Sequence, residues 1–142
     1  MTLPPLLNLP TIEDYRHHYE EVYCRSGIMT FDGIKVRFFP ESFTHAFFRD
    51  SSRRAKDKAV FDRRRAERMD WIRAILLDPH AELYKRVMPD GKIRRIALAP
   101  AVHYAVIIQM NPNRPDEARF ITAYVVDSGS ALQNMRANPR WT

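Results

Sequence analysis

The sequence predicts an α+β protein in which N-terminal helices pack on one face of a curved, four- or five-stranded antiparallel sheet. Two observations carry this prediction. Helix-type patterns dominate the first half of the chain, whereas residues 82–127 form consecutive strand-type segments separated by turn residues. Helices followed by a run of strands indicate an α+β layout rather than alternating β/α units. A chain of 142 residues that is 45% hydrophobic suffices for one domain with a single core.

The first segments are expected to be an arm and a helix. Residues 1–11 are rich in proline and should form an extended arm, so the single domain spans residues 12–142. Thr11 is followed by two acidic residues within the next three positions, which is typical of a helix start. The predicted helix continues to about Cys24 and ends at the following Ser-Gly pair.

A strand and a second helix are expected next. Gly33–Phe39 alternates between polar and apolar residues, which predicts a strand that stops at Pro40. The segment after Pro40 predicts a short helix whose apolar side includes Phe43. His45 lies beside this apolar stripe and not opposite it.

A long third helix is predicted over Asp57–Leu77. On a single helix of this length, Arg65 and Arg68 project into the apolar stripe. A buried charge without a partner costs on the order of several kcal/mol. These two arginines must therefore pair with acids or reach a functional cleft. The apolar residues that define the stripe are Phe61, Met69, Ile72, Ile75 and Leu76.

The second half of the chain predicts an antiparallel meander and a terminal helix. Asp90-Gly91 is a typical hairpin tip. The segment from Val102 is almost entirely apolar, as expected of a central strand that is buried on both faces. A short helix should begin near Ser128. The expected strands are Glu82–Val87, Lys92–Ala99, Val102–Met110 and Ala118–Asp127.

Composition and charge restrict the class of function. The net charge is +6, and the stretch Arg49–Arg73 holds ten basic and five acidic residues, which favours a polyanionic partner. The only cysteine, Cys24, excludes an internal disulfide framework and a cysteine-based zinc site, and it favours a reducing compartment. The histidines are scattered and no Gly-rich nucleotide-binding loop is present. We therefore expect neither a metal site nor another cofactor.

We expect no membrane segment and no leader. No stretch approaches the roughly 20 apolar residues of a membrane-spanning helix. The first ten residues contain three prolines and no basic residue, which is atypical of a signal peptide. The expectation is a cytoplasmic protein that has no membrane partner. Delivery into a target cell by a dedicated secretion machine would leave no such mark.

Four short phrases occur in an informative order. They are Phe43-Thr-His-Ala-Phe47, Arg65-Ala-Glu-Arg68-Met-Asp-Trp71-Ile72, Tyr104-Ala-Val-Ile-Ile108 and Phe120-Ile-Thr-Ala-Tyr124-Val. Together they resemble the phage-associated branch of the barnase–EndoU–colicin–RelE-like (BECR) ribonucleases, over about residues 35–127. The resemblance implies helices that precede a curved antiparallel sheet. It also implies RNA cleavage without a metal ion, in which the ribose 2′-hydroxyl attacks the adjacent phosphate and leaves a 2′,3′-cyclic end.

The resemblance assigns catalytic roles to four residues. The motif histidine falls on His45 and the helix basic residue on Arg65, and the terminal-strand hydroxyls fall on Thr122 and Tyr124. The chemistry of the residues agrees in part, because neutral imidazole moves protons near pH 7 and guanidinium groups hold phosphate oxygens. The residues expected to bind substrate are Arg68, Arg54, Lys56 and Tyr104.

The residues leave a second proton carrier and the final function open. Glu41, His103 and Tyr104 are each possible as the second acid or base, and spacing does not choose among them. The leading hypothesis is a toxin or prophage effector that cleaves RNA and needs an acidic antitoxin or immunity protein as its partner. Two alternatives stay open: a non-catalytic nucleic-acid-binding module, and a phage structural or packaging accessory protein.

Overall fold

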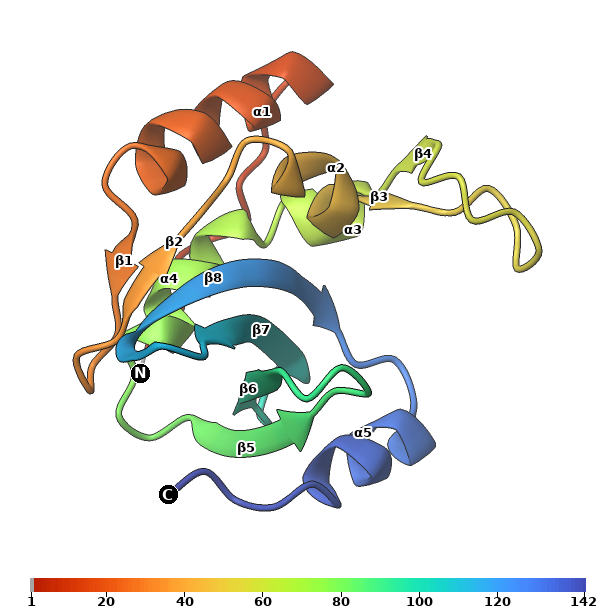
Figure 1. Ribbon diagram of the computed structural model, residues 1–142. Coiled ribbons are helices and arrows are strands. Elements are labelled where there is room, and N and C mark those ends of the chain that lie inside the picture. Colours follow the sequence, from red (N-terminus) through yellow and green to blue (C-terminus); the bar gives the residue numbers. More distant parts are fainter. Residues whose placement is uncertain (1) are drawn as a thin grey trace.

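A computed structural model describes residues 2–142 and confirms the α+β class (Figure 1). The elements are α1 (Ile12–Tyr19), the π-helix η1 (Glu20–Cys24), β1 (Ile28–Met29), β2 (Lys35–Arg37), α2 (Ser42–Phe47), β3 (Phe48–Arg49), β4 (Val60–Phe61), α3 (Arg63–Ala66), α4 (Met69–Leu76), β5 (Glu82–Val87), β6 (Ile93–Ala99), β7 (Tyr104–Asn111), β8 (Arg114–Val125) and α5 (Gly129–Arg136).

The main sheet has six strands in the order β1-β2-β8-β7-β6-β5, rather than the four or five expected. The meander β5–β8 is antiparallel throughout, as the turn residues predict. The difference arises at the other edge, where β2 joins β8 in parallel and the two-residue β1 pairs with β2. β8 begins at Arg114, so the connection from β7 is a tight turn and not the longer loop that its prolines indicate.

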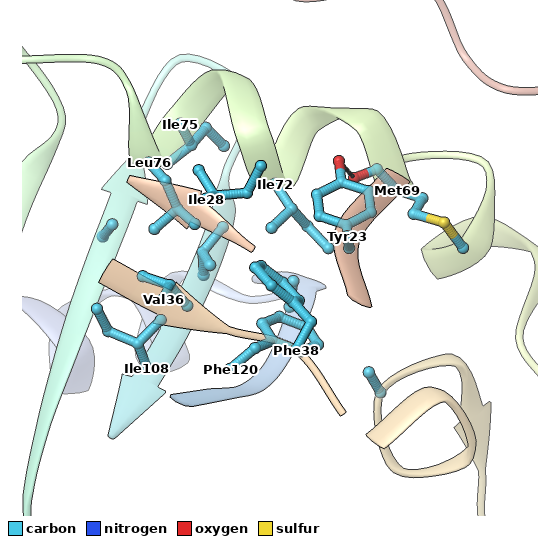
Figure 2. Close-up of a cluster of buried hydrophobic side chains, with 14 of the residues drawn as sticks. Tyr23, Ile28, Val36, Phe38, Met69, Ile72, Ile75, Leu76, Ile108 and Phe120 are labelled. Atoms are coloured by element: carbon cyan, nitrogen blue, oxygen red, sulfur yellow. Dashed lines mark hydrogen bonds between the residues drawn. The ribbon is translucent and has the colours of Figure 1, made fainter. Parts of the chain in front are cut away.

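Helices α1 to α4 cover one face of the sheet, here called the inner face. An aromatic cluster joins them to it: Tyr19 of α1 packs against Phe43 of α2 and against Phe120 of β8. Phe120 stacks on Phe38 with ring centroids 4.8 Å apart. Figure 2 shows Ile72, Ile75 and Leu76 of α4 above the sheet residues of this core. Burial of this aromatic and aliphatic core is the main hydrophobic contribution to the stability of the domain.

The opposite face of the sheet, here called the outer face, is only partly covered. Helix α5 places Met135 against Tyr84, Ile96 and Leu98 in a second, smaller buried cluster. Its cap is Ser128, whose hydroxyl accepts a hydrogen bond from the backbone N–H of Ala131. Within residues 2–142 no further helix lies over this face, which leaves side chains of β2, β5, β6, β7 and β8 accessible there.

The predicted single helix over Asp57–Leu77 is wrong. Asp62 has extended backbone and its carboxylate accepts from the N–H of Arg65, so a four-residue helix, α3, begins there. The helical conformation is interrupted again at Arg68, whose backbone is not helical, before α4 begins. Residues 48–61 instead form a two-stranded arm, β3 and β4 with their connecting loop, which projects from the body (Figure 1).

The N-terminal segment lies along the helices. The Tyr15 hydroxyl donates to the carbonyl oxygen of Leu7 (2.6 Å), and the Trp71 indole N–H donates to that of Pro4 (2.8 Å). The backbone N–H of Leu7 donates to the carbonyl oxygen of Glu67 (2.7 Å). These contacts tie residues 2–11 to α1 and α4 although the segment forms no helix or strand of its own.

Two adjacent phenylalanines provide a test of this core. Phe38 is 3% exposed and Phe39 is 37% exposed. We expect Phe38→Ala to lower the free energy of unfolding by about 3–5 kcal/mol, because it opens a cavity under the aromatic cluster. Phe39→Ala should change it by roughly 0.5 kcal/mol or less. Urea unfolding of the two variants measures both values, and equal losses would contradict the described packing.

Candidate active site on the outer face of the sheet

A β-bulge in β8 determines which side chains reach the outer face. Ile108 of β7 pairs with Phe120, whereas the preceding Ile107 pairs with Thr122, so Ile121 is an extra residue. Side chains two positions apart on a regular strand point to the same face. The bulge breaks this rule, so that Phe120 enters the inner core while Thr122 and Tyr124 lie on the outer face.

Thr122 and Tyr124 line a hollow of about 470 Å³ between the outer face and α5. Ile96, Ile107 and Met135 form its apolar wall. The polar residues that line it are Arg86, Arg94, Thr122, Tyr124, Asn134 and Asn138. The arrangement supplies hydroxyl, amide and guanidinium donors around one space that is open to solvent.

Arg65 lies beside Tyr124, one of the residues that line this hollow. Its guanidinium is centred 5.7 Å from the Tyr124 ring. The Nη1 atom donates to the carbonyl oxygen of Ala46 (3.4 Å), and Nε lies 3.4 Å from the carboxylate of Asp62. These contacts are long, and the side chain keeps 26% of its exposure. Arg65 is therefore oriented toward Tyr124 with donors left for a further acceptor.

His45 is exposed on α2, beside a second and smaller hollow of about 290 Å³. Glu41, Arg94 and Arg119 also line this hollow. Because Arg94 borders both hollows, the two adjoin. Partial desolvation by the surrounding protein atoms lowers the pKa of His45, and the positive charges of Lys58, Arg94 and Arg65 lower it further. The imidazole is therefore held in its neutral form, which can accept a proton.

The residues gathered here can perform a defined set of chemical tasks. A neutral imidazole serves as a base, guanidinium groups stabilise negative charge on phosphate oxygens, and hydroxyls donate hydrogen bonds. Of the residues that the resemblance assigns to catalysis, His45 lines one hollow and Thr122 and Tyr124 line the other, while Arg65 lies beside Tyr124. Of the three candidates for a second acid or base, only Glu41 lies beside His45.

Arg68 does not reach these hollows. Its guanidinium donates to the carbonyl oxygen of Arg64 (2.8 Å) and to the carboxylate of Glu67 (2.9 Å), and it lies 5.2 Å from the Trp71 ring. An arginine with these three partners is satisfied within the helical layer. The assignment of Arg68 to substrate binding therefore does not fit the structure.

Tyr104 also lies away from the outer face. Its side chain is fully buried in the inner core, with its ring 5.5 Å from that of Trp71. Burial raises the pKa of its hydroxyl, which has no hydrogen-bond partner among residues 2–142. The strand alternation places Tyr104 on the opposite side from Thr122 and Tyr124. A role for Tyr104 in substrate binding does not fit this burial.

Arg54 and Lys56 are exposed on the projecting arm between β3 and β4. They line neither hollow. Both side chains are open to solvent there, where they can contact an extended polyanion.

Sequence reasoning missed Arg86, Arg94 and Arg119. Arg94 and Arg95 are consecutive in β6, so one must face inward: Arg95 is 2% exposed and pairs with Asp32 (2.9 Å). Arg94 faces outward, where its Nε lies 3.4 Å from the amide oxygen of Gln109. The alternation Arg94, Ile96, Leu98 was the available signal, but it does not show that His45 lies opposite.

Comparison with known family models, curated proteins and solved structures gave no match. Over residues 2–142, no three or more His, Cys, Asp or Glu side chains are grouped so that they could hold a metal ion. Within the same range no helix has the length and apolar character needed to cross a membrane.

The environment of His45 predicts that the stability of the fold depends on pH. Since the folded pKa lies below the unfolded value of about 6.5, the unfolded chain binds this proton more tightly and His45 costs stability as the pH falls below about 6.5. Arg94→Gln removes one of the neighbouring positive charges and should raise the pKa of His45. An NMR titration of the imidazole C–H signals measures it. Arg25→Gln, on the helical side, is the control, and an unchanged His45 pKa in Arg94→Gln would contradict the proximity of the two side chains around one hollow.

Proposed function

We propose that this chain is an endoribonuclease that works without a metal ion and cleaves RNA by attack of the ribose 2′-hydroxyl, leaving a 2′,3′-cyclic phosphate. The observation that carries the proposal is the meeting of a neutral, exposed His45 with Arg94, Arg65 and Tyr124 around adjoining hollows. The resemblance to BECR ribonucleases supports it. In this proposal the sheet corresponds to the curved antiparallel sheet of that family.

His45 and Glu41 carry the protons in this proposal. The neutral imidazole of His45 removes the proton from the 2′-hydroxyl, and the carboxyl group of Glu41 relays a proton from solvent water to the leaving 5′-oxygen. Glu41 and His45 are four positions apart at the start of α2, a spacing that places side chains on the same side of a helix. The pair can therefore flank one scissile phosphate.

Arg94 and Arg65 hold the phosphate in this proposal. Both are partly exposed and keep free donors, because their partners in the fold are long contacts of 3.4 Å. A phosphate in the shared space would accept shorter, charge-assisted hydrogen bonds from them, and these strengthen as negative charge develops on its oxygens. The hydroxyls of Thr122 and Tyr124 add neutral donors on the adjoining wall.

The substrate and partner follow from charge in this proposal. With a net charge of +6 and arginines around the hollows, the chain attracts RNA and would cleave the RNA of its own cell. We therefore propose a toxin or prophage effector that is held inactive by an acidic antitoxin or immunity protein over the outer face.

A non-catalytic nucleic-acid-binding module is the second candidate. The pairing of Arg65 with Asp62 favours it, since a structural ion pair explains that arginine without chemistry. A phage structural or packaging accessory protein would use the same fold without needing His45. Both candidates predict that RNA remains intact.

Incubation of purified protein with mixed RNA in EDTA tests the ribonuclease proposal. We expect fragments with 2′,3′-cyclic ends, and a cleavage rate about 10²–10⁴-fold lower for His45→Ala, which lacks the base. Arg65→Ala should be slower by about 10²–10³-fold, because a donor to the developing charge is lost. Electrophoresis and mass analysis of the ends measure both.

His17→Ala is the matched control, since His17 is an exposed histidine on α1 away from the outer face. It should cleave at the wild-type rate. Intact RNA with the wild-type protein, or equal rates for the His45→Ala, Arg65→Ala and His17→Ala variants, would rule out the proposed chemistry.

A further inference from the structure

A row of basic residues crosses the outer face at right angles to the strands. The strand register places Arg37 of β2 beside Arg119 of β8, and Arg119 beside Gln109 of β7. Gln109 in turn pairs with Arg94 of β6, and Arg94 with Arg86 of β5. Four arginines and one glutamine thus occupy directly neighbouring positions on five strands, and we call them the arginine row.

The arginine row is unfavourable for folding by itself. Like charges that face each other on neighbouring strands repel, and a β-strand position can hold many other polar residues at no such cost. Only Arg37 has an ion pair within the described chain, a 3.4 Å contact with Glu117 that is shared with Arg114. Arg86, Arg94 and Arg119 have no acidic partner among residues 2–142. The row therefore presents donors for an external anion.

The three hollows of the outer face follow this row without interruption. Arg37, Gln109 and Arg119 line a hollow of about 560 Å³ at the β2 side. Arg119 also lines the hollow that contains His45, and Arg94 joins that one to the hollow of Thr122 and Tyr124. The path therefore runs past His45 and continues on both sides of it.

An exposed aromatic ring stands at the β2 end of the path. Phe39 is 37% exposed, and the guanidinium of Arg119 lies 5.4 Å from its ring. Farther along β8, Arg65 has the same relation to Tyr124. Exposed aromatic rings beside cations are the platforms on which unpaired bases stack, whereas a duplex keeps its bases stacked on one another.

We propose that the arginine row is the track for single-stranded RNA, with its phosphates on the arginines and one base on Phe39. This inference rests on the proposed function, which makes the bound strand an RNA and places the cut at His45. Four inter-strand spacings of about 4.8 Å give the row a length of about 19 Å. A strand of several nucleotides therefore contacts the protein well beyond the scissile phosphate.

The test is binding of an unstructured, fluorescently labelled 2′-O-methyl RNA 12-mer, which has no free 2′-hydroxyl and cannot be cleaved by the proposed reaction. Fluorescence anisotropy at several salt concentrations gives the Kd and its salt dependence. Arg37→Gln with Arg119→Gln should weaken binding at least tenfold and reduce the slope of log K against log salt by about 1.4, since two phosphate contacts are lost. A matching 12-bp duplex should bind more weakly to the wild-type protein.

The control removes the same charge from the other side of the molecule. Arg25, directly after η1, and Arg73 of α4 are both exposed, and the double variant Arg25→Gln with Arg73→Gln should bind the 12-mer like the wild type. Phe39→Ala should weaken binding about fivefold or more through loss of base stacking. Phe31→Ala, which removes an exposed ring beside Arg95, should not. Circular dichroism and thermal melting confirm that each variant is folded.

The outcomes separate this inference from the proposed ribonuclease. Equal weakening by the two double variants, or equal affinity for duplex and single strand, overturns the track. If the row variants lose binding as expected but the wild-type protein never cuts RNA, the track stands and the proposed chemistry fails. If RNA is cut and the row variants bind like the wild type, the chemistry stands and the track fails.

Discussion

The bulge at Ile121 is the constraint on which the two faces of this domain depend. β8 is the longest strand, and it contributes to the aromatic core through Phe120 and to the outer face through Thr122. A regular strand would place both on the same face. Without the extra residue, either the stacking of Phe120 on Phe38 or the exposure of Thr122 would be lost. One inserted residue thus lets a single strand serve the core and the candidate site together.

Charge is distributed unequally between the two faces, and this difference follows from how each is covered. Where helices bury an arginine, an acid accompanies it: Arg95 pairs with Asp32 and Arg68 with Glu67. Burial of an unpaired charge would cost on the order of several kcal/mol, so folding requires the pairing. On the open part of the outer face, water solvates the arginines and no such requirement exists. Unpaired arginines can gather there because the face is uncovered.

Local signals allowed much of the fold to be predicted from the sequence. Thr11 caps α1 as its position predicts, and the Asp90-Gly91 turn joins β5 to β6. The helix over Asp57–Leu77 could not be recognised as broken, because its apolar residues keep helical spacing across the gap. Competing local contacts decide the outcome: Asp62 caps a new helix, and the side chain of Arg68 lies against Trp71 three residues further on. Periodicity reports which residues are buried, and not whether one helix or several bury them.

The candidate site was predictable in its motif residues and not in its neighbours. His45 lies next to an apolar stripe whose burial leaves it at the surface, which is a local property of α2. Arg94 lies beside His45 only because β6, β7 and β8 pair in one register, with the bulge included. A shift of one residue in that register would exchange Arg94 with Arg95 and bury the wrong charge. The ion pair of Arg95 with Asp32 is therefore more than a stabilising contact. By holding Arg95 on the inner face it keeps Arg94 on the outer face, where the arginine row requires it.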